Sequence, residues 1–127
     1  MIDSISDLFT RIRNANLARR AKVFVPYTKI NESLINILFK HGFIGDFEKV
    51  TSQLLITLKY KNTNKKPIIL QIKRLSRPGC RLYVNAKNIP QICGKLGVVF
   101  LSTSKGILSD REAAFYKIGG EILGFVS

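Results

Sequence analysis

The apolar residues of this chain come in short runs, and each run ends at residues that favour turns. Pro26, Gly42 and the pair Gly119-Gly120 close three of these runs, and the polar tract 62–67 closes another. None of the runs approaches the roughly 20 residues that a membrane-spanning helix needs. With 127 residues, of which 46% are hydrophobic, the chain can still bury a substantial core. We therefore expect a folded, soluble protein built from short helices and strands.

Two segments have the apolar periodicity of amphipathic helices. The stripe of the first helix consists of Ile5, Leu8, Phe9 and Ile12. Arg11 and Arg13 then fall on the opposite side of that helix. In the second helix Asn31 is the expected N-cap and Gly42 ends the helix. The inward stripe expected for the second helix consists of Leu34, Ile35, Leu38 and Phe39.

The rest of the chain alternates between short strands and turns. Strands are expected at residues 23–25, 54–60, 68–73, 81–84, 98–101 and 122–126, and short helices at residues 89–93 and 110–117. Residues 102–109 are expected to form a polar loop, and the tract 62–67 is a candidate junction between two lobes. The pattern indicates an α+β fold with short strands.

The charge of the chain is strongly one-sided. Lys and Arg number 21 against 8 Asp and Glu, which gives a net charge of +13. Between Glu48 and Asp110 there are twelve basic residues and no acid, and residues 10–31 hold six more without an acid. A charge run can be an ordinary solvated face, but such faces usually mix both signs. These runs favour a polyanion, with nucleic acid first. An anionic membrane is the alternative, and no basic amphipathic helix with aromatic anchors supports it.

Residues able to carry out catalysis or bind metal are few. His41 is the single histidine, and it is expected at the exposed end of the second helix. Cys80 and Cys93 form no CxxC motif, so neither a zinc ribbon nor a redox pair is indicated. We therefore expect no enzymatic activity, no metal, no cofactor and no small-molecule substrate.

Three segments could contact nucleic acid. The stretch 102–106 offers hydroxyls, backbone amides and a lysine to phosphate and sugar oxygens, or it is a turn that bonds only its own backbone. Residues 94–97 match the GxxG loop of KH modules, but that loop joins two helices, whereas this one precedes an apolar strand. We therefore interpret Gly94 as the residue that ends a helix. Tyr83, beside Arg81, could stack on a base or pack against the protein.

Taken in order, four motifs strongly resemble the bacterial-type small-subunit ribosomal protein eight family. These motifs lie at residues 7–16, 73–83, 102–106 and 119–121, and the similarity extends over essentially the whole chain. The resemblance implies an N-terminal α/β lobe, residues 1–64, and a C-terminal mostly β lobe, residues 65–127. It also implies direct binding to the central domain of small-subunit ribosomal RNA, contact with neighbouring small-subunit proteins, and no enzymatic activity.

The resemblance assigns RNA contacts position by position. In the C-terminal lobe a loop would meet an irregular RNA helix, and other RNA-binding positions would lie beside this loop. The loop residues are Ser102, Thr103, Ser104, Lys105 and Gly106, and the other positions are Tyr83, Arg81, Gly119, Gly120 and Glu121. In the N-terminal lobe the phosphate-facing positions are Arg11, Arg13, Asn14, Thr28 and Lys29. The N-terminal positions would fix the position of the RNA, and the loop would discriminate between RNAs.

Two departures from the family pattern affect these assignments. Ala113-Ala114 stands where the family commonly has an Ala-Arg pair, so one basic contact is missing, and the aromatic ending of the family is replaced by 123–127. The abundance of Ile, Asn and Lys fits a plastid or other organellar ribosome as well as a bacterial cytoplasm.

Two other functions stay open at this point. The protein could also repress translation by binding a messenger RNA that mimics its ribosomal site, as members of this family can in bacteria. An RNA-modifying or hydrolytic enzyme is the second, and no acid-base pair or metal cluster in the sequence supports it.

Overall fold

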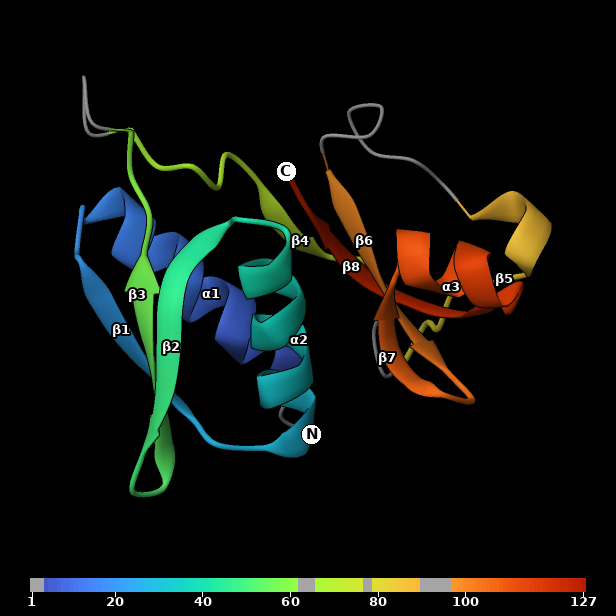
Figure 1. Ribbon diagram of the computed structural model, residues 1–127, viewed down its shortest axis with the longest axis horizontal. Helices are drawn as coiled ribbons and strands as arrows, with labels where there is room; N and C mark the ends of the chain where they lie inside the picture. Colours follow the sequence, from blue (N-terminus) through green and yellow to red (C-terminus); the bar gives the residue numbers. More distant parts are fainter. Residues whose placement is uncertain (1–3, 62–65, 77–78, 90–96) are drawn as a thin grey trace. The chain divides into compact units, whose positions relative to one another are not determined.

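The computed structural model describes residues 4–61, 66–76, 79–89 and 97–127. They belong to two compact units, Ser4–Leu70 and Gln71–Ser127, and each unit has its own antiparallel sheet (Figure 1). The predicted α+β class is confirmed. The lobe boundary expected after residue 64 falls in the segment 62–65, which lies outside the described residues, whereas the compact units divide at Leu70 and Gln71. No helix in the described ranges is long and apolar enough to cross a membrane.

The N-terminal unit packs two helices with a three-stranded sheet. Its elements are α1 (Ser4–Leu17), β1 (Lys22–Pro26), α2 (Lys29–Lys40), β2 (Ile44–Val50) and β3 (Gln53–Leu58). The strand order is β1-β3-β2, with α1 against β1 and α2 against β2. Burial alternates along β3, because every second side chain points to the same face of a sheet. The fully buried side chains include Leu8, Phe9, Ile12, Leu34, Leu38 and Ile56.

The start of α2 differs from the sequence-based prediction. Thr28 is the N-cap, and its side chain accepts a hydrogen bond from the backbone N–H of Asn31. Asn31 is buried inside the first turn instead, where its Nδ2 donates to the Pro26 carbonyl over 2.9 Å. Phe39, predicted to face inward, is 44% exposed and meets Phe47 of β2 edge to face. Phe39 is at the edge of the apolar face of α2, next to the residues that are buried against the sheet.

The strand β2 has no counterpart in the sequence-based prediction. It lies at an edge of its sheet, and most of its side chains are exposed. Asp46, Glu48 and Lys49 interrupt the apolar alternation there. Because an edge strand with little burial needs few apolar residues, the usual periodicity signal is missing.

The C-terminal unit is organised around its last strand. Its elements are β4 (Ile72–Arg74), β5 (Tyr83–Val84), the 3₁₀ helix η1 (Ala86–Asn88), β6 (Val98–Thr103), β7 (Gly106–Ser109), α3 (Asp110–Tyr116) and β8 (Gly120–Val126). β8 pairs with β6 on one edge and with β4 and β5 on the other, while β7 extends the sheet beyond β6. The helix α3 lies against β6 and β7. Its Ala113 joins a core cluster with Val99, Leu101 and Ile122.

Several boundaries in this unit also differ from the prediction. The expected polar loop 102–109 is a β-hairpin, because Ser102 and Thr103 complete β6 and residues 106–109 form β7. Strand pairing uses backbone groups, so polar side chains at these positions do not prevent it. Leu108 adds an apolar contact, because it packs against the core cluster. The strand expected at 68–73 is shorter and ends one residue later, at Ile72–Arg74, and the one expected at 81–84 is reduced to Tyr83–Val84. Most of the expected helix 89–93 lies outside the described residues.

Candidate nucleic-acid interface

Strand register in the C-terminal unit places three of the predicted RNA-binding residues in one row. Tyr83 of β5 lies directly opposite Glu121 of β8, and Glu121 lies directly opposite Ser102 of β6. Directly opposed residues share a face of the sheet. Leu101 and Ile122, the adjacent residues of their strands, pack with α3, so the row is on the face away from α3. Tyr83 is 66% exposed there, which leaves its ring open to a ligand.

A buried serine holds the carboxylate in the middle of this row. Ser76 is fully buried, and its Oγ donates to Glu121 Oε2 over 2.5 Å while accepting the backbone N–H of Leu82 over 3.1 Å. Arg81 and Tyr83 are the residues on either side of Leu82 in the chain. The Tyr83 hydroxyl, and then the negative charge of Glu121, raise the pKa of the Arg81 guanidinium. Glu121 is therefore fixed from inside the protein, and Arg81 and Tyr83 stay exposed around it.

In the hairpin turn next to this row, the hydroxyl of Thr103 is hydrogen-bonded within the protein and that of Ser104, among the residues that the structure describes, is not. The Thr103 hydroxyl donates to the Gly106 carbonyl over 2.8 Å and accepts the backbone N–H of Lys105 over 3.2 Å, so it is used within the turn. Gly106 has a φ of +104°, a conformation that favours glycine. Ser104 projects from the tip of the turn. It is exposed, and within the described part of the chain its hydroxyl makes no hydrogen bond.

The predicted residues Gly119 and Gly120 bring neighbouring strands close to β8. A Cβ added to Gly119 would collide with the Val84 carbonyl oxygen, and one added to Gly120 would collide with the Ser102 carbonyl oxygen. Both obstacles are backbone atoms, which cannot rotate away as a side chain can. The two glycines thus allow β5 and β6 to approach β8 where the row forms.

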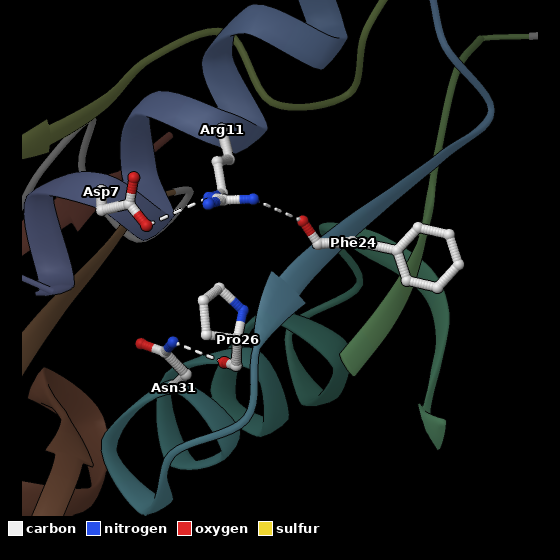
Figure 2. Close-up of polar contacts among 5 residues, drawn as sticks. All are labelled: Asp7, Arg11, Phe24, Pro26 and Asn31. Atoms are coloured by element: carbon white, nitrogen blue, oxygen red, sulfur yellow. Dashed lines mark hydrogen bonds and ion pairs between the residues drawn. The ribbon is translucent and has the colours of Figure 1, made fainter. Parts of the chain in front are cut away.

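In the N-terminal unit, a basic groove runs beside α1 and β1. It has a volume of about 560 Å³, and its lining residues are Arg11, Asn14, Ala15, Ala18, Arg20, Lys22, Val23 and Phe24. The Arg11 guanidinium is held in place on two sides, since its Nε lies 3.0 Å from Asp7 Oδ2 and its Nη1 donates to the Phe24 carbonyl over 3.2 Å (Figure 2). The Phe24 ring points away from this bridge.

The structure groups only some of the predicted N-terminal residues. Arg11 and Asn14 line the groove, whereas the exposed Arg13, Thr28 and Lys29 do not belong to its lining. Sequence reasoning did not single out Arg20 and Lys22, although both lie in the acid-free stretch 10–31 that carried the signal. The Thr28 hydroxyl caps α2, so any phosphate contact by Thr28 shares this oxygen with the helix.

Acidic side chains in both units are used by local structure. Asp7 pairs with Arg11, the Asp46 carboxylate accepts the Phe47 N–H, and Glu112 forms a capping box with Ser109 at the start of α3. Each of these three carboxylates therefore has a bonding partner close to it in the chain. Most of the surrounding Lys and Arg side chains are exposed, which leaves a strongly positive surface.

The fold and the two surfaces define a class of protein. It is a small, basic α+β protein with polar or cationic surface in each unit, and no three potential metal ligands cluster among the residues that the structure describes. The family model described as Ribosomal protein S8 matches residues 3–127. The chain belongs to this family, whose members are structural components of the ribosome and not enzymes. The predicted family is thereby confirmed.

Curated relatives match over nearly their whole length. The small ribosomal subunit protein uS8c of Rhodomonas salina is 45% identical, covering 98% of this chain and 97% of that protein. The protein of the same name from Oltmannsiellopsis viridis is 48% identical, with 95% of each chain covered. Small ribosomal subunit protein uS8 of the Microcystis aeruginosa strain NIES-843 is 45% identical, covering 98% of this chain and 96% of that protein. The expected location, a plastid or bacterial ribosome, fits these relatives.

Proposed function

We propose that this protein binds small-subunit ribosomal RNA directly, at the central domain, and helps to assemble the surrounding part of the subunit with neighbouring proteins. Membership of the ribosomal protein S8 family supports a structural place in the small subunit. A net charge of +13 supports a polyanionic partner. The binding surface in this proposal is the C-terminal row with the adjoining turn, and the N-terminal basic groove adds affinity.

The observation that carries the proposal is the row formed by Tyr83, Glu121 and Ser102 beside the exposed Ser104 turn. It combines an aromatic ring, a fixed carboxylate and hydroxyl groups within one patch. Regular A-form RNA hides its base edges in a narrow major groove, whereas irregular helices expose them. A patch with several hydrogen-bonding groups and a stacking surface suits such an irregular helix. Glu121 can accept from base amino groups, and it disfavours close contact with phosphate.

The N-terminal unit has a different part in this proposal. Its groove presents the cations Arg11, Arg20 and Lys22, with the Asn14 amide among them. Cations contact the phosphates that every RNA sequence shares, so they fix the position of the RNA without reading its bases. Lys29 and Arg13 contribute in the same way as exposed charges. Specificity then comes mainly from the C-terminal row and turn.

The first test is a titration of the full chain with central-domain RNA and with a scrambled duplex of equal length, at several salt concentrations. We expect the central-domain RNA to bind more tightly by at least roughly a hundredfold at physiological salt, because nonspecific charge binding weakens steeply with salt. Equal affinities at every salt concentration would contradict the proposal. The positive charge would then account only for nonspecific binding to polyanions.

The second test removes one hydroxyl from the turn. Ser104→Ala should weaken central-domain binding roughly 3- to 10-fold, the usual value of a lost hydrogen bond, and leave the scrambled duplex unaffected. Ser52→Ala, at the exposed turn between β2 and β3, is the matched control and should change neither affinity. Wild-type affinity of Ser104→Ala for the central-domain RNA would remove Ser104 from the site.

A further inference from the structure

The C-terminal end of α3 carries two exposed aromatic side chains that the sites above do not use. Phe115 is 79% exposed and Tyr116 is 46% exposed. Their rings meet edge to face, with centroids 5.2 Å apart and an interplanar angle of 80°. A single exposed apolar residue is ordinary on a protein surface. Two rings that orient each other, in contrast, form a surface of defined geometry.

The helix that carries these rings is held firmly on its other side. Ala113 is fully buried in the core cluster, and the capping box of Ser109 and Glu112 fixes the first turn. Lys117 ends the helix in the left-handed conformation, with a φ of 57°. The aromatic pair therefore lies on a short helix that has a defined cap at each end.

The aromatic pair lies beside the hairpin turn. The strand β7 leads away from the turn and α3 returns along it, so the end of the helix comes back to the start of the strand. Lys105 of the turn places its ammonium 4.2 Å from the centroid of the Tyr116 ring. This cation occupies a face of Tyr116, whereas the ring of Phe115 is the more exposed of the two.

The charge around the pair is positive. Lys105 lies over Tyr116 and Lys117 follows it in the chain. Lys87 is exposed on η1, which contacts α3. The acids of this helix, Asp110 and Glu112, are in its first turn, and Glu112 is engaged in the capping box with Ser109. A flat apolar surface surrounded by cations complements a nucleotide, which combines a flat base with a negative phosphate.

We propose that Phe115, oriented by Tyr116 and Lys105, stacks on an unpaired base of the bound RNA. Lys105 and Lys117 would contact the phosphates beside that base. This inference rests on the proposed function and extends it to a second face of the hairpin, because α3 lies on the face of the sheet opposite the row of Tyr83, Glu121 and Ser102. Both faces of the hairpin would then contact the bound RNA.

The test uses variants of one side chain in the full-length protein. Phe115→Ala and Phe115→Leu should both weaken central-domain RNA binding, by roughly 5- to 100-fold, because stacking on an aromatic ring is lost. Phe115→Tyr keeps an aromatic ring and should bind like the wild type. Leu17→Ala is the matched control, since Leu17 is 76% exposed in the other unit and carries no ring. A fully paired duplex of equal length, with no unpaired base, should bind equally to all variants.

Two results would overturn stacking. If Phe115→Leu binds the central-domain RNA like the wild type, the aromatic ring is not needed. If Phe115→Ala instead leaves all RNA affinities unchanged but reduces incorporation of the protein into reconstituted small subunits, the aromatic pair contacts a protein. The high exposure of Phe115 makes loss of folding an inadequate explanation, and urea unfolding of each variant checks this directly.

A single-stranded oligoadenylate of twelve nucleotides separates this inference from the proposed function. If wild-type protein does not prefer central-domain RNA to a scrambled duplex, the proposed function fails, whatever the variants do. Stacking is then judged on the oligoadenylate alone. Weaker binding by Phe115→Leu than by Phe115→Tyr supports it, and equal binding contradicts it.

Discussion

At Gly119 and Gly120, a missing side chain allows three strands to meet. The backbone carbonyl groups of Val84 and Ser102 occupy the space where a Cβ would lie. The sequence motif at 119–121 indicated RNA contact at these glycines, whereas the structure adds a steric requirement for glycine.

We predict that Gly119→Ala and Gly120→Ala each lower the free energy of unfolding by about 1–3 kcal/mol, because overpacking forces the strands apart. Urea unfolding measures this. Gly79→Ala is the control, because apart from Gly79 and its two chain neighbours no atom of the described residues lies within 4 Å of the Cβ position there. A stability of Gly120→Ala equal to that of Gly79→Ala would show that β6 and β8 can separate without loss.

Ser76 has a structural effect on the site without being exposed to solvent. Its hydroxyl links the Glu121 carboxylate to the backbone of Leu82. The residue lies within the motif 73–83, but no local pattern distinguished it from other serines, because its partner is 45 positions away.

We expect Ser76→Ala to destabilise the protein by about 1–3 kcal/mol, since the mutation removes a buried hydroxyl and leaves the Leu82 N–H and the Glu121 carboxylate without this partner. The comparison is Ser104→Ala, which removes an exposed hydroxyl and should change stability by less than about 0.5 kcal/mol. Thermal or urea unfolding gives both values. Equal stability of the two variants would mean that water replaces the Ser76 hydroxyl at no cost.

Among the secondary-structure elements, α2 shows how a candidate RNA contact can have a structural function. Thr28 was assigned to RNA by its position in the family, and the structure uses its hydroxyl as the N-cap of α2. The helix itself was predicted, but its start was placed three residues too late because Asn31 is also a good capping residue.

The capping role predicts that Thr28→Ala lowers stability by about 1 kcal/mol, and that Thr28→Ser restores most of it. RNA titration of the same variants separates the two roles. If the hydroxyl serves the helix alone, Thr28→Ala should bind RNA like Thr28→Ser under conditions in which both are folded. Full stability of Thr28→Ala would contradict the cap.

The hairpin of β6 and β7 illustrates a second limit at this scale. Polar residues at 102–105 suggested a loop, and hydroxyl side chains do favour turns. Pairing of Thr103 with Gly106 nevertheless reduces the turn to Ser104 and Lys105. The consequence for function is that the hydroxyl groups of Ser102 and Ser104 are presented by a defined hairpin.

For the whole molecule, charge is the property with the widest effect. With a net charge of +13, we expect the affinity for RNA in the proposed function to depend strongly on salt, because binding releases counterions from the phosphates. A complex with about six phosphate contacts would lose roughly three orders of magnitude in affinity between 50 and 200 mM salt.

We predict that Lys29→Gln reduces the slope of log affinity against log salt by about 0.7–0.9, the value for one phosphate contact, and weakens central-domain RNA and scrambled duplex equally. Lys40→Gln, at the exposed opposite end of α2, is the matched control. Titrations at four or more salt concentrations give the slope. An unchanged slope for Lys29→Gln would exclude Lys29 from the phosphate contacts.

The sequence alone was sufficient for the α+β class, the positions of α1, β3, β6 and β8, the basic character and the protein family. These properties depend on local periodicity, on composition or on motifs within short segments. The edge strand β2 was missed because it buries few apolar side chains.

Only the tertiary structure brought the site together. Tyr83, Glu121 and Ser102 are far apart in the chain, and strand register makes them neighbours. The hydrogen bond between Ser76 and Glu121 and the contact between Lys105 and Tyr116 also join residues that are separated in the chain. They form because β8 and α3 both pack against β6. The physical reason is that pairing between distant strands is set by how their buried faces fit together, and no local pattern along the chain records that register.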